Sequence, residues 1–88
     1  MTDEPLEKTE LEKSRDIISQ LKEMAHYSKT NVEKLTTFWL LLDGEMKQPD
    51  TAKKLEALLA LQNAFHDALG TFVSDWEIEC NRIENEAS

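Results

Sequence analysis

An apolar residue recurs at every seventh position through the first half of this chain. The repeat continues from Leu11 to Met46 without a change of phase, and a second apolar column follows it three positions later. Two columns with this spacing lie side by side on one face of an α-helix, which is typical of a helix that packs along its length against another. Their members are Leu11, Ile18, Ala25, Val32, Trp39 and Met46 in the first column and Leu21, Leu35 and Leu42 in the second.

The second half of the chain carries the same pattern. Its columns are Ala52, Leu59, His66, Val73 and Cys80, and Leu55, Gln62, Leu69, Trp76 and Ile83. Three further apolar residues, Leu58, Phe65 and Phe72, widen the stripe on one flank. A stripe of this width is more typical of a helical bundle than of a two-stranded coiled coil.

One turn divides the chain near its middle. Pro49 disfavours helical geometry at Gln48, and Asp50 or Thr51 has a side chain able to cap a following helix. At the other end, Pro5 suits the first turn of a helix. We therefore expect a frayed N-terminus at residues 1–4 and one helical domain over residues 5–88, with arms at 5–47 and 52–86 and a turn at 48–51.

The weakest helical stretch is residues 27–31, where Thr30 and Glu33 also have the spacing of a capping box. A break there would give three helices, but the seven-residue repeat passes through without the phase shift that a loop normally causes. We predict an all-α fold, a long helical hairpin with antiparallel coiled-coil-like arms that associates into a helical bundle. A monomeric three-helix bundle is the alternative.

Folding the hairpin at its middle places residues whose numbers sum to about 96 opposite each other, because both helices rise equally per residue. His66, which interrupts an apolar column, then lies near the weak stretch of the first arm. Buried polar groups normally find hydrogen-bond partners. We therefore predict a polar layer within the core, formed by Ser28, Thr30, Gln62 and His66.

Charge and cysteine content limit the partners and the compartment. Eighteen acidic residues against ten basic ones give a net charge of −8, which repels nucleic acid and anionic lipid. Cys80 is the single cysteine, so no intramolecular disulfide forms. No strictly apolar run exceeds five residues, too few to cross a bilayer. We expect a cytoplasmic protein with neither a nucleic acid nor a membrane as partner.

Residues 25–30, Ala-His-Tyr-Ser-Lys-Thr, resemble the phosphoacceptor site of histidine phosphotransfer domains, where an exposed His is followed three residues later by Lys and then Gly. The resemblance implies a phosphorelay protein that uses His26, with Lys29 neutralising the phosphoryl charge. Thr30 stands where the glycine is expected, and the likeness covers only six residues. The favoured interpretation of His26 is a surface histidine on an amphipathic helix.

The segment Phe38 to Leu42 is apolar nearly all round the helix, so a single hairpin partner covers only one side of it. We predict that this segment is a protein interface, and a homodimer is the expected assembly because symmetric dimers are the commonest oligomers. The interface residues are Phe38, Trp39, Leu40, Leu41 and Leu42.

The sequence holds no recognisable nucleophile and base pair, phosphate-binding loop or metal-ligand cluster, and a small all-α chain offers little concave volume for a substrate. We therefore predict a non-enzymatic protein-binding, regulatory or chaperone-like module with a protein partner of unknown identity and no cofactor, metal or small-molecule substrate. Two alternatives stay open. One is the phosphorelay protein using His26, and the other is an acidic inhibitor that competes with nucleic acid for a basic protein through its C-terminal arm.

Overall fold

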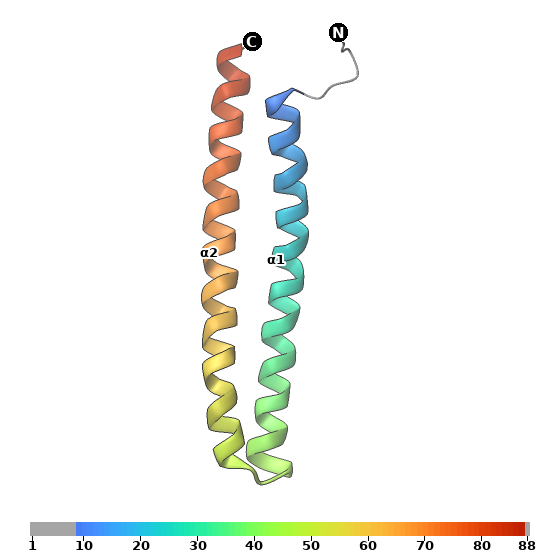
Figure 1. Cartoon of the computed structure of the whole chain (residues 1–88), viewed down its shortest axis with the longest axis vertical. Coiled ribbons are helices and arrows are strands. Elements are labelled where there is room, and N and C mark those ends of the chain that lie inside the picture. Colours follow the sequence, from blue (N-terminus) through green and yellow to red (C-terminus); the bar gives the residue numbers. More distant parts are fainter. Residues whose placement is uncertain (1–8, 88) are drawn as a thin grey trace.

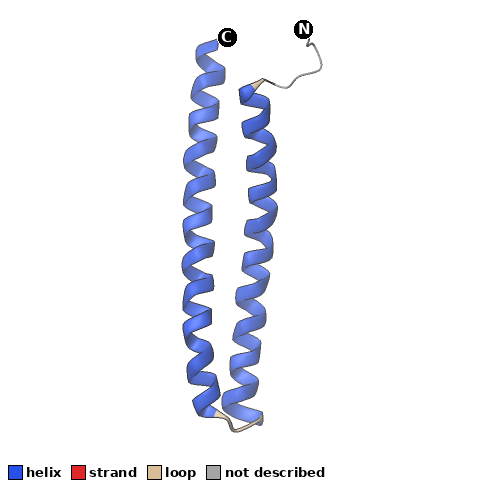
Figure 2. Cartoon of the chain, viewed as in Figure 1, coloured by secondary structure: helices blue, strands red, loops and turns tan. Residues whose placement is uncertain are grey.

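Two long antiparallel helices make up the fold (Figure 1). The computed structural model describes residues 9–87. Helix α1 spans Glu10–Leu40 and continues into a π-helical segment, η1, at Leu41–Glu45, and after a short turn helix α2 spans Pro49–Ala87. Within residues 9–87 there is no strand, as Figure 2 shows. The predicted all-α fold is confirmed, and the chain forms a long helical hairpin.

A capping box begins α1. The Thr9 hydroxyl accepts a hydrogen bond from the Glu12 backbone N–H at 3.1 Å, and the Glu12 carboxylate accepts one from the Thr9 N–H at 2.9 Å. These bonds satisfy two N–H groups that a helix start leaves unpaired. Helix α1 therefore begins at Glu10. The expected helical residues 5–8 and the expected frayed residues 1–4 lie outside the described part of the chain.

Helix α1 runs without a break through residues 27–31. The Thr30 hydroxyl does not cap a new helix but donates to the His26 carbonyl oxygen one turn earlier, at 3.3 Å. The continuous seven-residue repeat thus gave the right prediction here. The three-helix alternative, which required a break at this point, does not describe the hairpin.

The turn lies slightly earlier than predicted. In η1 the Met46 N–H donates to the carbonyl oxygen of Leu41, five residues back, at 2.8 Å, and Lys47 then adopts a left-handed conformation with φ of 52°. Helix α2 begins at Pro49, whose missing N–H costs nothing in a first turn. The connection is therefore at residues 46–48, and not at 48–51. The wider π-helical turn also shifts the phase of the repeat, which leaves Met46 52% exposed.

The two columns of each helix meet in a seam along the hairpin. Contacts between the helices join residues whose numbers sum to between 94 and 99, such as Ser28 with His66 and Arg15 with Glu84. This is close to the predicted register of 96. Most of the buried core lies in the half away from the turn, where Leu11, Leu21, Ala25 and Trp76 pack against the cluster Ile18, Leu69, Val73 and Cys80.

The hairpin is a single layer of helices. It extends 64 × 24 × 14 Å, and its smallest dimension is little more than the diameter of one helix. A single layer leaves both broad sides of the hairpin open. Those two sides differ sharply in chemistry.

Candidate functional site

The seam of each helix has a flank on either side. In the antiparallel hairpin, equivalent flanks of the two helices lie on the same side of the molecule. Because α2 runs opposite to α1, the residues that precede the first column lie on the same side of the hairpin in both helices. Those that follow the second column lie together on the other side. One side of the hairpin consequently collects charged residues, and the other collects apolar ones.

The charged side is closed by ion pairs between the helices. Arg15 Nη2 lies 2.7 Å from a Glu84 carboxylate oxygen, and Lys22 Nζ lies 2.5 Å from one of Glu77. Each of these four residues follows the second column of its helix. Side chains here are partly solvated, so the pairs contribute little to stability, but they join charged groups of the two helices across this side.

The opposite side, which we call the apolar face, holds nine of the thirteen large apolar side chains that the described residues expose. Each is between 41% and 67% exposed. Contiguous exposed apolar patches are uncommon on small monomeric proteins. Its members are Ile17, Met24, Tyr27, Phe38 and Leu41 from α1 and η1, and Leu58, Leu61, Phe65 and Phe72 from α2.

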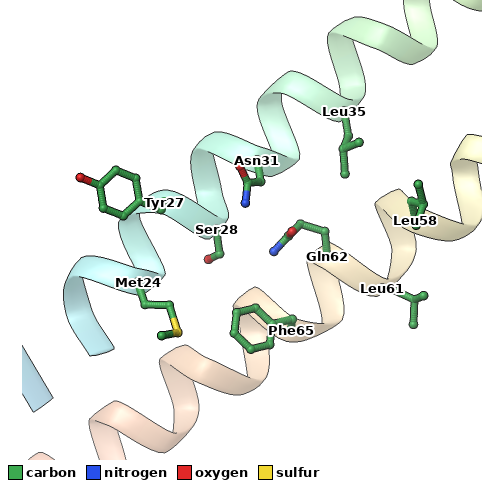
Figure 3. Close-up of a pocket in the computed structure, with 9 residues that line it drawn as sticks. All are labelled: Met24, Tyr27, Ser28, Asn31, Leu35, Leu58, Leu61, Gln62 and Phe65. Atoms are coloured by element: carbon green, nitrogen blue, oxygen red, sulfur yellow. The ribbon is translucent and has the colours of Figure 1, made fainter. Parts of the chain in front are cut away.

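A groove of about 380 Å³ lies in the middle of the apolar face (Figure 3). Five of its lining residues belong to the apolar face, and the others are Ser28, Asn31, Leu35 and Gln62. Figure 3 shows that Ser28 and Gln62 extend from opposite helices into the space between them. The groove therefore has apolar walls and a polar floor.

The floor of the groove adjoins a hydrogen bond between the helices. The Ser28 hydroxyl oxygen lies 2.6 Å from His66 Nδ1 and 2.8 Å from the Ala25 carbonyl oxygen. A carbonyl oxygen only accepts, so the single hydroxyl hydrogen is donated to Ala25. His66 then carries a hydrogen on Nδ1 and donates it to the Ser28 hydroxyl oxygen.

The structure brings three of the four predicted polar-layer residues together. Ser28 is buried at 3% exposure, and His66 and Gln62 are half-buried beside it. Thr30 does not join them, since its hydroxyl bonds to the backbone of its own helix. Its position in the sequence, two residues after Ser28, turns its side chain away from the seam.

The predicted interface segment divides between three surroundings. Trp39 and Leu42 are half-buried in the seam, and the Trp39 indole N–H donates to a Glu56 carboxylate oxygen at 3.0 Å. Phe38 and Leu41 lie on the apolar face, 50% and 41% exposed. Leu40 is 60% exposed but follows Trp39 around the helix, on the side where the ion pairs lie.

His26 is exposed on the charged side of α1, with its ring edge-on to that of Tyr27 at a centroid distance of 5.7 Å. Cys80 is a free thiol buried in the core. Among residues 9–87, no group of three or more His, Cys, Asp and Glu side chains could hold a metal ion. Nor does either described helix contain a segment long and apolar enough to span a bilayer.

The acidic C-terminal arm is partly neutralised by its own arginine. Arg82 donates to Glu79 from Nε at 2.9 Å and to Glu86 from Nη1 at 2.6 Å. The hydrogen bonds from Arg82 hold the pKa of Glu79 below its ordinary value, and the arginine charge acts in the same direction. The pKa of Arg82 is raised for the same reason. Together with Glu77 and Glu84 on the charged side, four acidic groups of this arm are engaged in ion pairs.

Sequence reasoning found only part of the apolar face. The flank residues Leu58, Phe65 and Phe72 stood out in the second half, but Ile17 and Met24, which occupy the equivalent position in α1, did not. Their spacing of seven, continued at Phe38 after one interruption at Asn31, was the available signal. No family model matches this chain, and neither curated proteins nor solved structures show a significant similarity to it.

Proposed function

We propose that this chain is a non-enzymatic protein-binding module, regulatory or chaperone-like, that acts by helix-to-helix contact through its apolar face. The observation that carries the proposal is the concentration of nine exposed large apolar side chains on one side of a one-layer hairpin. Stable domains bury such a face against a second layer of secondary structure. In our proposal the helices of a partner supply that layer and complete a helical bundle.

The energetics favour an occupied face. Full burial of a large apolar side chain contributes about 1.5–3 kcal/mol. The side chains of the apolar face are roughly half buried in the hairpin itself, so they already gain roughly half of that free energy. About 1 kcal/mol remains for each, so nine of them offer a gain comparable to the 4–15 kcal/mol of freedom lost on association. Apolar surface contributed by the partner adds to this gain. The buried free thiol of Cys80 is compatible with the cytoplasmic location that we propose.

Two adjacent leucines provide the test. A tagged chain is purified from its native source as the wild type, as Leu41→Lys and as Leu40→Lys, and the proteins that accompany each are identified. Leu41 lies on the apolar face and Leu40 on the charged side, so the first variant should lose the partner and the second should keep it. Binding is then repeated with the purified partner. Equal binding by both variants would show that the apolar face is not the contact.

The two alternative functions remain predictions with tests of their own. An acid-labile phosphate on His26, formed from acetyl phosphate or a kinase domain and lost in His26→Ala, would identify a phosphorelay protein. Loss of partner binding at moderate salt would identify an acidic inhibitor, since attraction between exposed charges is screened. The described structure favours neither over the apolar face, because His26 lies on the charged side and four acidic groups of the C-terminal arm are ion-paired.

A further inference from the structure

We infer that the occupant of the apolar face is a second copy of this chain, laid face to face with its turn at the opposite end. The four helices then form an antiparallel bundle in which α1 packs on α1 and α2 on α2 of the other copy. This inference rests on the proposed function, because it names the partner of the same face. Three features of the hairpin support it: the area of the face, the symmetry of its apolar residues and the distribution of charge.

The area fits a stable dimer. The apolar face runs from the level of Ile17 to that of Leu41, about 36 Å at a rise of 1.5 Å per residue. With the 24 Å width of the hairpin, the face covers about 850 Å². A standard specific interface buries about 800 Å² on each partner. A second hairpin of the same dimensions covers the face without leaving a large apolar remainder.

Five of the nine residues of the apolar face are arranged symmetrically about one level of the hairpin. On α2, Leu58 and Phe72 lie seven positions either side of Phe65. On α1, Met24 and Phe38 lie seven positions either side of Asn31. Phe65 and Asn31 are themselves opposite each other, since their numbers sum to 96.

The two copies are related by a twofold axis that lies in the interface at that level, perpendicular to the helices. It brings Leu58 onto Phe72 of the second copy and Met24 onto Phe38 of the second copy. It also brings Phe65 and Asn31 each onto its own counterpart. These five apolar residues therefore meet one another across the contact, as an interface between identical subunits requires.

Charge selects the antiparallel arrangement. Residues 29–66, the half next to the turn, carry five basic and five acidic side chains, whereas residues 9–28 and 67–87 together carry four basic and ten acidic ones. Two copies with their turns at the same end would place both acidic halves together. In the antiparallel pair each acidic half faces a neutral half, and Lys54 of one copy comes to the level of Asp75 of the other.

Disulfide trapping distinguishes the arrangements. In a Cys80→Ala background, with helix content checked by circular dichroism, Asn31→Cys should form a disulfide-linked dimer under mild oxidation, because the twofold axis passes beside residue 31. The matched control is Asn63→Cys, an exposed asparagine at nearly the same level on the charged side, which should not cross-link. In a parallel pair α1 packs on α2, so Asn31→Cys would also fail. Failure of Asn31→Cys overturns the antiparallel arrangement.

Sedimentation equilibrium tests the second copy itself. The wild type should have twice the mass of the 10.1 kDa chain at micromolar concentration. Leu61→Lys, on the apolar face, should weaken the dimer at least tenfold, and Ile78→Lys should not. Leu61 and Ile78 are 67% and 64% exposed on the same helix, so both variants replace an apolar side chain of similar exposure.

The outcomes separate the two proposals. A wild-type monomer at every concentration overturns the second copy, and the proposed function survives if Leu41→Lys still loses a partner that Leu40→Lys keeps. A wild-type dimer that Leu61→Lys leaves intact overturns the apolar face as the dimer contact.

Discussion

At the scale of single residues, the bond between Ser28 and His66 is a partly buried polar contact between the two helices. A slip of one helix by seven residues would keep most apolar pairs but would place Ser28 opposite Leu59 or Val73, where it has no partner from α2. Polar groups within helical seams fix register in this way. The bond also explains why a serine is tolerated at 3% exposure in a column otherwise suited to leucine.

Removal of the Ser28 hydroxyl should destabilise the hairpin. In Ser28→Ala the Nδ1 hydrogen of His66 loses its acceptor in a half-buried position, which we expect to cost about 1 kcal/mol after the gain in helix propensity. Urea unfolding followed by circular dichroism measures the difference. Thr30→Ala is the matched control, because its hydroxyl bonds only to the backbone of α1, and it should change stability by less than about 0.5 kcal/mol. Equal effects of the two variants would mean that the cross-helix bond does not fix the register.

At the scale of the helices, α2 contains a residue that its packing does not require. Gly70 lies within the helix, and a Cβ atom added there would meet no atom within 4 Å. Close approach of the helices therefore does not explain this glycine. Gly70→Ala should raise the free energy of unfolding by up to about 1 kcal/mol, since alanine has the higher helix propensity. Ala68→Gly, two residues away, should lower it by a similar amount. If Gly70→Ala instead destabilises the protein, a partner approaches α2 at this point.

The arginine near the end of α2 makes the helix terminus sensitive to acid. Because the pKa of Glu79 is lowered in the folded protein, the ionised group stabilises the helix above pH 4.5, its ordinary value, and this contribution disappears as the pH falls through the lowered pKa. An NMR titration of the Glu79 carboxyl should show a higher pKa in Arg82→Gln than in the wild type. Lys53→Gln, which removes a distant cation, should leave it unchanged. An unchanged pKa in Arg82→Gln would contradict the assigned cause.

The helices were predictable from the sequence, but their ends and their shared face were only partly so. The seven-residue repeat predicts which side of each helix faces the other, and the central position of Pro49 predicts which residues lie opposite each other. Thr9 and Glu12 have the spacing of a capping box in the sequence, whereas Pro5 favours an earlier start of the helix. The π-helical turn was not predictable, because a hydrogen bond from Met46 to Leu41 depends on how the chain enters the connection. The apolar face appears only when the flanks of both helices are placed on one side.

At the scale of the whole molecule, the open apolar face of the one-layer hairpin leads us to expect that stability depends on protein concentration. If a second copy covers the face, unfolding is linked to dissociation, and the Tm rises with protein concentration. A hundredfold increase in concentration should raise the Tm by about 5–10 °C for an assembly of this size. Differential scanning calorimetry measures the shift. Leu61→Lys should show a much smaller dependence, and a wild-type Tm that does not change would exclude linked dissociation.

The position of the buried core has a consequence for the order in which the hairpin forms and opens. Ile18 and Leu69 are 51 positions apart, whereas Ala52 is the one buried residue between residues 29 and 66. Contacts near the turn close short loops but bury little apolar surface. Most of the hydrophobic stabilisation is gained only when a long loop has closed, and closing that loop has an entropy cost. In a single hairpin, the half beside the turn is therefore less stable than the half that contains the buried cluster. Backbone amides near Phe38 and Leu58 should exchange with solvent sooner than those near Ile18 and Val73, because opening beside the turn disrupts less of the buried core.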